Sequence, residues 1–301
     1  MTTQLDTPTT IDSDARQSQR LAGGTPLPDA SLADDVRFGF GRNWRRFLSR
    51  LNDERIRIAE ESIQTLLQVK SLAGRSFLDV GCGSGLFSLS AMNLGAEMVY
   101  SFDFDPDSVG CAEYLRDRFH PDTDRWTIER GSALDAEYLQ SLGRFDVVYS
   151  WGVLHHTGDM WRALALVADM VKPGGTLVIS IYNHQRWSGA WTRIKLLYSS
   201  GIPGRLLVLA SVFPAYALLQ AAADILSLRN PFRRITGYRA KRGMSWLHDM
   251  LDWLGGYPFE VARPEEVFSF YRDRGFQLTG LTTRGPSHGC NEYVFERVVS
   301  E

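Results

Sequence analysis

The most constraining feature of this sequence is a short apolar segment that runs directly into a cluster of glycines. The apolar segment spans Phe77 to Val80, and an apolar-periodic segment begins at Leu86. Between them stand Gly81, Cys82, Gly83, Ser84 and Gly85. This order predicts a buried strand, a tight loop and the start of a helix. Glycines let the backbone approach a ligand closely, and amides at a helix start donate hydrogen bonds, so the stretch predicts a ligand-binding turn.

The spacing of the glycines separates two kinds of ligand. The dinucleotide fingerprint has its third glycine at the position that Leu86 occupies here, so a pyrophosphate-binding loop is disfavoured. An NAD-dependent dehydrogenase is therefore the less favoured enzyme class.

Length and composition predict one large globular domain or one domain with a sizeable insertion. The 301 residues are 44% hydrophobic, which is enough to form a core. The net charge of -2 provides no broad basic field, so a nucleic-acid partner is not expected. One local basic patch consists of Arg229, Arg233, Arg234, Arg239, Lys241 and Arg242. A local nucleic-acid contact, a solvated face, a phosphate contact and an anionic-lipid contact are open alternatives for it.

The cysteines and the N-terminus indicate the compartment. Cys82, Cys111 and Cys290 are odd in number and lack Cys-x-x-Cys spacing, which disfavours a disulfide framework or a structural zinc site. The N-terminus lacks a basic region followed by an apolar core, so no signal peptide is expected. These features predict a reducing, cytoplasmic location.

One apolar stretch tests this prediction. Residues Leu206 to Ala223 contain no formal charge over eighteen residues, which is near the lower limit for spanning a bilayer. Pro214 and Gln220 interrupt the stretch, and the last two expected strands follow it. The sequence therefore predicts a buried or interfacial helical pair, with a membrane-surface role as the less favoured alternative.

Strand-like and helix-like patterns alternate from residue 76 onwards, as a doubly wound α/β sheet requires. The expected strands are 76–80, 97–102, 126–130, 145–150 and 175–181, and the expected helices are 86–94, 106–119, 134–142 and 160–170. The domain organisation predicted is a disordered tail over 1–35, N-terminal cap helices over 36–75, a ligand-binding core over 76–186, a helical lid over 187–258, and a last helix with closing strands over 259–301.

Asp103 ends the second expected strand, about twenty residues beyond the glycine loop. A carboxylate there can accept hydrogen bonds from both ribose hydroxyls in the crevice outside the carboxyl ends of the strands. Asp105 is expected to cap the following helix through its side-chain oxygen. The loop and Asp103 together predict a nucleoside site.

Four motifs in order resemble the class I S-adenosylmethionine-dependent methyltransferases. They are Leu78-Asp79-Val80-Gly81-Cys82-Gly83-Ser84-Gly85, Phe102-Asp103, Phe145-Asp146-Val147-Val148 with Val153-Leu154-His155-His156, and Val171-Lys172-Pro173-Gly174-Gly175-Thr176-Leu177. The resemblance implies a Rossmann-like seven-stranded sheet whose last strand is antiparallel. Residues 276–283 and 292–299 fit as the closing pair.

The resemblance also implies a cofactor, S-adenosyl-L-methionine, with S-adenosyl-L-homocysteine as product. The residues implied for its methionine part are Asp79, Gly81, Cys82, Gly83 and Gly85. Asp103 is implied for the ribose, and Phe104, Ser132, Ala133 and Leu134 for the adenine. The sulfonium is implied to lie near Ser150, Trp151 and Gly152. Ser132 departs from the family pattern, because many relatives carry an aspartate there.

The sequence is similar nearly end to end to one bacterial branch of this superfamily, often labelled as quinone-pathway-like methylases. The motifs that carry this similarity are Phe40-Gly41-Arg42-Asn43-Trp44, Ser150 to Trp161, Asp252 to Glu260 and Gly289-Cys290-Asn291-Glu292. The similarity names no substrate, because a fold does not assign a function.

Catalytic and substrate residues are expected at the exit of the fourth strand and in the lid. We expect His155 to act as base or substrate-orienting residue, because histidine titrates near working pH, and His156 to be its packing partner. The alternative is that both are structural. The candidate substrate contacts are Tyr182, His184, Tyr238, Arg239 and His248. His248 lacks the dense ligand set of a metal site, and no metal is expected.

These residues predict methylation of a small-molecule acceptor, at the hydroxyl of a phenol, a sugar or a natural-product intermediate. One alternative is a lipid or prenyl-linked acceptor reached by peripheral membrane contact. Another is a non-catalytic S-adenosylmethionine-binding regulator. The sequence does not predict an oligomeric state.

Overall fold

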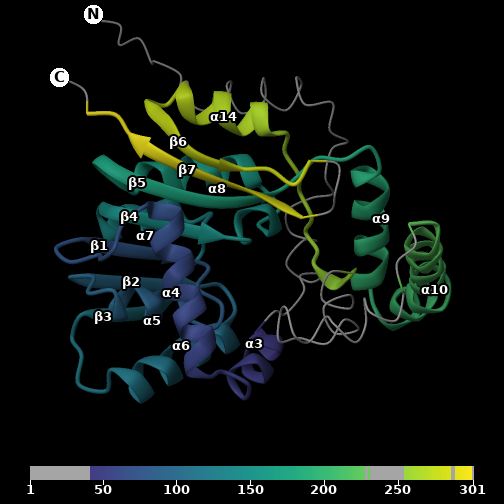
Figure 1. Ribbon diagram of the computed structural model, residues 1–301, viewed down its shortest axis with the longest axis horizontal. Coiled ribbons are helices and arrows are strands. Elements are labelled where there is room, and N and C mark those ends of the chain that lie inside the picture. Colours follow the sequence, from purple (N-terminus) through teal and green to yellow (C-terminus); the bar gives the residue numbers. More distant parts are fainter. Residues whose placement is uncertain (1–40, 228–229, 231–253, 286–288, 300–301) are drawn as a thin grey trace, which may run out of the picture.

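A computed structural model describes residues 41–227, 230, 254–285 and 289–299 of the chain (Figure 1). The predicted tail over 1–35, the aromatic residues Phe38 and Phe40, and lid residues 231–253 lie outside the described residues.

The centre of the molecule is one seven-stranded sheet. Its strands are β1 (Ser76–Val80), β2 (Met98–Asp103), β3 (Trp126–Arg130), β4 (Phe145–Trp151), β5 (Val171–Tyr182), β6 (Phe276–Thr282) and β7 (Cys290–Arg297). Their order across the sheet is β3-β2-β1-β4-β5-β7-β6. Strands β1 to β5 pair in parallel, and β7 runs antiparallel to both β5 and β6. The predicted Rossmann-like sheet with an antiparallel last strand is confirmed.

Both faces of the sheet are buried at the central strands β1 and β4, which explains why these strands are nearly continuous apolar runs. In β1, Leu78 and Val80 face one core cluster and Phe77 faces the other. In β4, Val148 faces the first cluster and Val147 the second. This alternation follows from the two-residue period of a strand.

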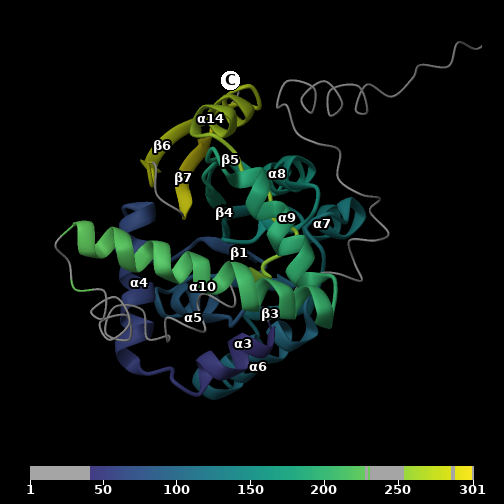
Figure 2. The same cartoon turned by 90° about the vertical axis from the view of Figure 1, so that its right-hand side faces the viewer.

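Helices cover the two faces in two groups of three. The first core cluster holds α7 (Ala136–Leu142), α8 (Met160–Asp169) and α14 (Pro264–Arg272) against the sheet. The second holds α4 (Asp53–Leu67), α5 (Leu86–Asn93) and α6 (Pro106–Phe119). The N-terminal helix α3 (Gly41–Leu48) lies beside α6 (Figure 2).

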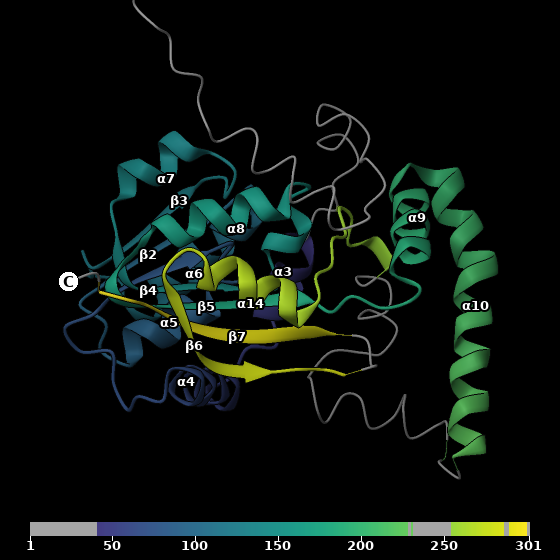
Figure 3. The ribbon, with the colours of Figure 1, turned by 90° about the horizontal axis from the view of Figure 1, so that it is seen from above.

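Two further helices lie beyond the carboxyl ends of the parallel strands. They are α9 (Ser188–Ser199) and α10 (Ile202–Leu226), which fall within the segment predicted as a lid. Figures 1 and 3 show α9 nearer the sheet and α10 on its outer side. A short 3-10 helix, η1 (Leu154–His156), follows β4 at the same end of the sheet.

The fifth strand starts earlier than its sequence predicts. Lys172 to Gly175 have the composition of a turn, but the strand already begins at Val171. The reason is an irregular register, because Phe145 pairs with Val171 and Val147 with Thr176. The residues between bulge out of the ladder, and Gly174 supplies a φ of 72°.

Asp146 joins three strands at the amino end of the sheet. Its carboxylate accepts hydrogen bonds from the Ser76 amide at 2.8 Å and the Ser76 hydroxyl at 2.6 Å. It also accepts a hydrogen bond from Lys172 Nζ at 2.8 Å. These contacts lower the pKa of Asp146 to about 2, because they outweigh the opposing effect of burial.

We expect Asp146→Ala to lower the free energy of unfolding by about 2 kcal/mol, because it leaves a half-buried amide and ammonium without their acceptor. Denaturant titration measures this change. Asp169→Ala, at an exposed carboxylate, is the control and should change stability by less than about 0.5 kcal/mol. Equal effects of the two substitutions would contradict the structural role of Asp146.

Candidate cofactor and active site

The glycine loop is enclosed by side chains from two distant segments. Gly81 and Gly83 have φ values of 73° and 55°, which few other residues adopt without strain. A Cβ on Gly81 would come within 2.3 Å of Val153, in the segment after β4. A Cβ on Gly83 would come within 2.9 Å of the Trp44 ring, from α3. Glycine is therefore required at both positions, because of the backbone conformation of the turn and because neighbouring side chains leave no room for a Cβ.

The carboxylate of Asp103 fixes the position of this loop. One oxygen accepts the Gly83 amide and the other accepts the Asp105 amide, each at 2.9 Å. Asp105 in turn caps α6 and accepts the Gly41 amide of α3 at 2.8 Å. Each Asp103 oxygen has a second lone pair, so the geometry is compatible with the predicted ribose contact.

Asp79 lies directly beneath the loop and ends a buried chain of hydrogen bonds. Trp126 Nε1 donates to the Ser101 hydroxyl at 2.9 Å, and Ser101 donates to Ser88 at 2.8 Å. Ser88 donates to the Asp79 carboxylate. All four side chains are buried, so the chain fixes the orientation of the carboxylate.

The carboxyl groups of Asp79 and Asp103 both have raised pKa values, so their ionised forms are poorly stabilised. Burial raises the pKa of Asp79 to about 7, Ser88 opposes the rise, and the charge of Asp103 adds to it. Burial raises the pKa of Asp103 to about 6, although the amides of Asp105 and Gly83 oppose the rise. None of the effects on either group comes from a cation within the described part of the chain. A cationic ligand is therefore favoured here, and a phosphate is disfavoured.

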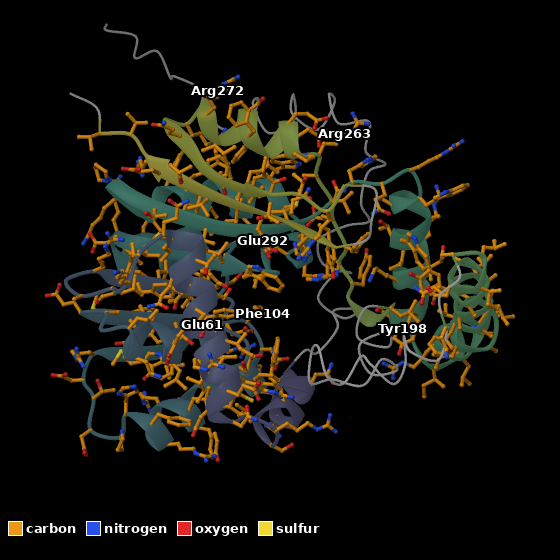
Figure 4. The ribbon with its side chains drawn as sticks, viewed as in Figure 1. Glu61, Phe104, Tyr198, Arg263, Arg272 and Glu292 are labelled. Atoms are coloured by element: carbon orange, nitrogen blue, oxygen red, sulfur yellow. The ribbon has the colours of Figure 1, made fainter. Side chains whose placement is uncertain are left out.

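The predicted adenine side is built from β2 and the turn after β3. Phe104 is exposed at this end of the sheet (Figure 4). The Arg130 guanidinium lies 5.5 Å from its ring centroid. The Ser132 hydroxyl accepts the Leu134 amide at 3.2 Å, and Ala133 is buried. The Ser132 hydroxyl thus shapes the turn. The contact of these residues with an adenine remains a prediction.

The exit of β4 places the three residues predicted for the sulfonium differently. Ser150 is fully buried and donates to the Val80 carbonyl at 3.1 Å, so its hydroxyl ties β4 to β1. Trp151 is 41% exposed and donates through Nε1 to Glu292 at 3.3 Å. Gly152 has a φ of 78°, which turns the chain towards η1. Trp151 and Gly152 are therefore accessible to a ligand, and Ser150 is structural.

His155 and His156 lie in η1 and differ in their surroundings. The His155 ring is buried, and Nδ1 has no hydrogen-bond partner within the described ranges. Burial, His156 and Lys195 lower the pKa of His155 well below its ordinary value, and the Ser180 backbone opposes them through a hydrogen bond. His156 Nδ1 lies 2.6 Å from the Pro258 carbonyl. His155 is thus a neutral imidazole whose Nδ1 is unpaired within the described residues, and His156 is held in place by the Pro258 carbonyl.

Glu260 clamps the segment that carries these histidines. Its carboxylate accepts the Gly158 amide at 3.0 Å and the Met160 amide at 3.1 Å, which caps α8. Its own amide donates to the His155 carbonyl at 2.9 Å. The clamp binds the segment that follows the lid to the exit of β4.

A buried ring cluster connects His155 to the lid. The Tyr182 ring centroid lies 4.2 Å from that of His155 and 4.9 Å from that of Phe259. Lys195 of α9 is fully buried, and its Nζ lies 4.7 Å from the Phe259 centroid. Burial lowers the pKa of Lys195 to about 7. Of the predicted substrate residues, Tyr182 is the one that the structure brings to His155.

The other predicted substrate residues do not join this cluster. His184 is exposed and lines a separate pocket of about 350 Å³ together with Asn183, Arg263 and Asn291. Tyr238, Arg239 and His248 lie outside the described residues. Within the described ranges, no group of three or more His, Cys, Asp or Glu side chains could hold a metal.

Several residues of the site carry no sequence signal strong enough to predict them. Ser88, Ser101 and Trp126 meet only because three elements pack together, and Lys195 looks like a surface residue of a helix. Glu260 does belong to a motif that resembles the bacterial branch, and that motif is the one signal that could have found the clamp.

Cys82 is buried beside the loop, and burial raises the pKa of its thiol well above the ordinary value. The Cys82 side chain is therefore a neutral thiol that packs beside the loop.

Comparison with known proteins identifies a family. A family model described as a methyltransferase domain matches residues 44–274. The chain is 34% identical over 114 residues to a tRNA U34 carboxymethyltransferase of Pseudoalteromonas translucida, covering 38% of this chain and 34% of that protein. It is 35% identical over 127 residues to a ubiquinone biosynthesis O-methyltransferase of Cereibacter sphaeroides, covering 42% of this chain and 49% of that protein. These matches span less than half the length of each relative.

A solved structure shares the fold. An O-methyltransferase family protein from Burkholderia thailandensis superposes with a TM-score of 0.51 at 16% sequence identity. The superposition covers 97% of this chain and 70% of that one. At this identity the similarity supports the fold alone.

The raised pKa of Asp79 leads to a test without any ligand. The unfolded carboxyl titrates near its ordinary pKa and the folded one near 7, so the ionised form destabilises the folded protein. We expect the unfolding free energy of wild type minus that of Asp79→Asn to fall by a few kcal/mol between about pH 4 and pH 7, because one pKa unit corresponds to about 1.4 kcal/mol. Denaturant titrations at several pH values measure this difference.

The matched control is Asp169→Asn at an exposed carboxylate, for which the difference should stay flat with pH. His155 acts in the opposite direction, because its lowered pKa removes stability as the pH falls below its unfolded value. Both the wild type and Asp79→Asn contain His155, so its contribution cancels in the difference between their unfolding free energies. A difference that rises with pH would contradict the burial of an ionisable Asp79.

Proposed function

This chain belongs to the methyltransferase-domain family, and from this membership we propose that it transfers a methyl group from S-adenosylmethionine to the hydroxyl of a small molecule. The cofactor supplies an activated methyl group, and S-adenosylhomocysteine is the product. The residues that would hold it are the loop from Gly81 to Gly85, Asp79, and Asp103.

One observation carries the cofactor assignment, namely a buried carboxyl group, Asp79, beside a partly buried one, Asp103, both with raised pKa values. S-Adenosylmethionine has two positive groups, an ammonium and a sulfonium, and no phosphate. A nicotinamide dinucleotide would bring its pyrophosphate over the glycine loop, close to the Asp79 carboxyl group, where like charges repel, whereas Asp103 would contact a ribose in either ligand. The loop therefore fits the methyl donor and disfavours the dinucleotide.

His155 supports an oxygen acceptor. In the transfer, a bond forms between the acceptor oxygen and the methyl carbon as the sulfur–methyl bond breaks, and the hydroxyl proton must leave. A neutral imidazole with an unpaired Nδ1 is suited to accept that proton. The role of His155 as base and of Tyr182 as acceptor contact are parts of this proposal.

The named relatives support the reaction more than the acceptor. The ubiquinone biosynthesis O-methyltransferases support transfer to a hydroxyl, and the tRNA carboxymethyltransferases point to a nucleic acid. The slightly acidic charge of this chain favours the small molecule. A prenyl-linked acceptor is the second candidate, because α10 exposes a long apolar surface. A non-catalytic regulator is the third, and turnover would exclude it.

The test begins with binding and proceeds to turnover. S-Adenosylhomocysteine should raise the thermal unfolding temperature, and NAD should not. A panel of phenols, sugars and prenylated quinols is then assayed for release of S-adenosylhomocysteine. Stabilisation by NAD alone would overturn the cofactor assignment, and turnover with amines alone would overturn the oxygen acceptor.

We expect Asp103→Asn to weaken S-adenosylhomocysteine binding at least about tenfold, because the amide removes the charge and turns an NH2 group towards a loop amide. Calorimetric titration measures the dissociation constant. Asp124→Asn, an exposed aspartate outside the site, should bind as wild type. Unchanged binding by Asp103→Asn would remove Asp103 from the cofactor site.

We expect His155→Gln to lower kcat for a hydroxyl acceptor by about 10²-fold or more, because general-base catalysis contributes in that range. Binding of S-adenosylhomocysteine should be unchanged. His120→Gln replaces a histidine whose ring contacts Asn93, away from the site, and should leave kcat unaltered. A wild-type kcat in His155→Gln would show that His155 is not the base.

A further inference from the structure

Helix α10 is unusual among the described elements because so little of it is buried. Its length and composition are sufficient to cross a membrane, yet only 6% of its most apolar window is buried. It has 25 residues and is about 37 Å long, since a helix rises 1.5 Å per residue. A helix that is apolar all round and exposed to water is unfavourable unless another phase or partner covers it.

The exposed side chains form a continuous stripe. Leu207, Leu218 and Ile225 are 57%, 71% and 61% exposed. They are separated by 11 and 7 residues, which are close to whole numbers of helical turns, so they point to the same side. Leu206 and Leu219 widen the stripe and are 60% and 69% exposed.

The opposite side of α10 is fixed to the rest of the protein. Leu209 and Val212 on that side pack against a small core that includes Tyr198 of α9. Gly204 lets the helices approach closely, because a Cβ there would lie 2.1 Å from the Leu197 carbonyl. The stripe is therefore presented outwards by a packed helical pair, and Figures 1 and 3 show α10 on the outer side of α9.

The topology excludes a single crossing of a bilayer by α10. Strand β5 precedes the helix and β7 follows it, yet residues 176–182 pair with residues 290–296 in one sheet. A return crossing would need about 20 apolar residues. The sequence from 228 to 253 carries six basic residues, so it supplies no such span. An apolar helix that cannot cross must lie along the surface that covers it.

The charges around α10 indicate which surface this is. Between Arg186 and Ser227 the acidic residues are limited to Asp224, which is buried, while Arg193 and Arg205 precede the apolar stretch. The sequence from Arg229 to Arg242 then has six basic residues and no acidic one. Arginine and lysine beside an apolar helix favour anionic lipid headgroups, and they would repel one another across a self-association interface.

We propose that α10 docks in the plane of an anionic lipid bilayer, with the stripe of Leu207, Leu218 and Ile225 in the acyl region. This inference is independent of the proposed methyl transfer, because it concerns the outer face of the helical pair. Docking would also set the position of the candidate active site relative to the membrane. Lys195 of α9 packs on Phe259, beside Tyr182, so docking would hold the lid side of the candidate active site against the membrane.

Flotation of the full chain with lipid vesicles tests the proposal. Vesicles of phosphatidylcholine containing about one third phosphatidylglycerol should bind the protein, and vesicles of phosphatidylcholine alone should bind it much more weakly, with the difference reduced at high salt. The double variant Leu218→Ser/Leu219→Ser should lower binding at least about tenfold. The matched control is Ile58→Ser/Leu281→Ser, which removes two exposed apolar side chains from α4 and β6 and should bind as wild type.

Circular dichroism and S-adenosylhomocysteine titration show whether each variant is folded. Absence of vesicle binding by the wild-type chain would overturn the proposal. So would a dimer in solution that the Leu218→Ser/Leu219→Ser variant dissociates, since the stripe would then be covered by a second copy. Loss of vesicle binding with intact cofactor binding separates the failure of docking from the failure of the proposed function.

Discussion

The site depends on one interaction, the acceptance of two backbone amides by the carboxylate of Asp103. This carboxylate ends β2 and holds the glycine loop that follows β1, so two neighbouring parallel strands present a single rigid surface. Burial of the group is costly, and that cost is visible in its raised pKa. The loop is thus held in one arrangement before any ligand binds, and under the proposed function a ligand with positive charge would stabilise the protein.

The core of the fold could be predicted because its strands and caps have local causes. Strands β1 and β3 and helix α6 begin and end where the sequence predicts, since buried parallel strands are apolar runs and Pro106 with Asp105 marks a helix start. The beginning of β5 could not be predicted. Its Lys-Pro-Gly-Gly composition favours a turn, and only pairing of Val171 with Phe145 extends the strand through it.

The site could be predicted only in part. Residues that the topology of the sheet brings together could be predicted, and contacts between residues distant in sequence could not. The glycine loop, Asp103 and the segment after β4 all stand at carboxyl ends of parallel strands, which topology alone brings to one edge. The contacts that orient them come from residues far away in sequence. Glu260 reaches the Gly158 amide across 102 residues, and Ser101 reaches Ser88 only after β2 and α5 pack together. No local pattern encodes such contacts, so the hydrogen-bonding role of Ser150 was also not foreseen.

The two sides of the site have opposite electrostatic character, and this difference suits methyl transfer. On the loop side, Asp79 and Asp103 favour a cationic donor. On the lid side, burial keeps His155 neutral and lowers the pKa of Lys195 to about 7, while Tyr182 and Phe259 supply apolar surface. A displacement at a sulfonium consumes positive charge as it proceeds, so a weakly charged, water-excluding wall on the acceptor side does not oppose the reaction. In the proposed reaction the carboxylates would hold the donor, and the clamp of Glu260 fixes the segment that carries His155.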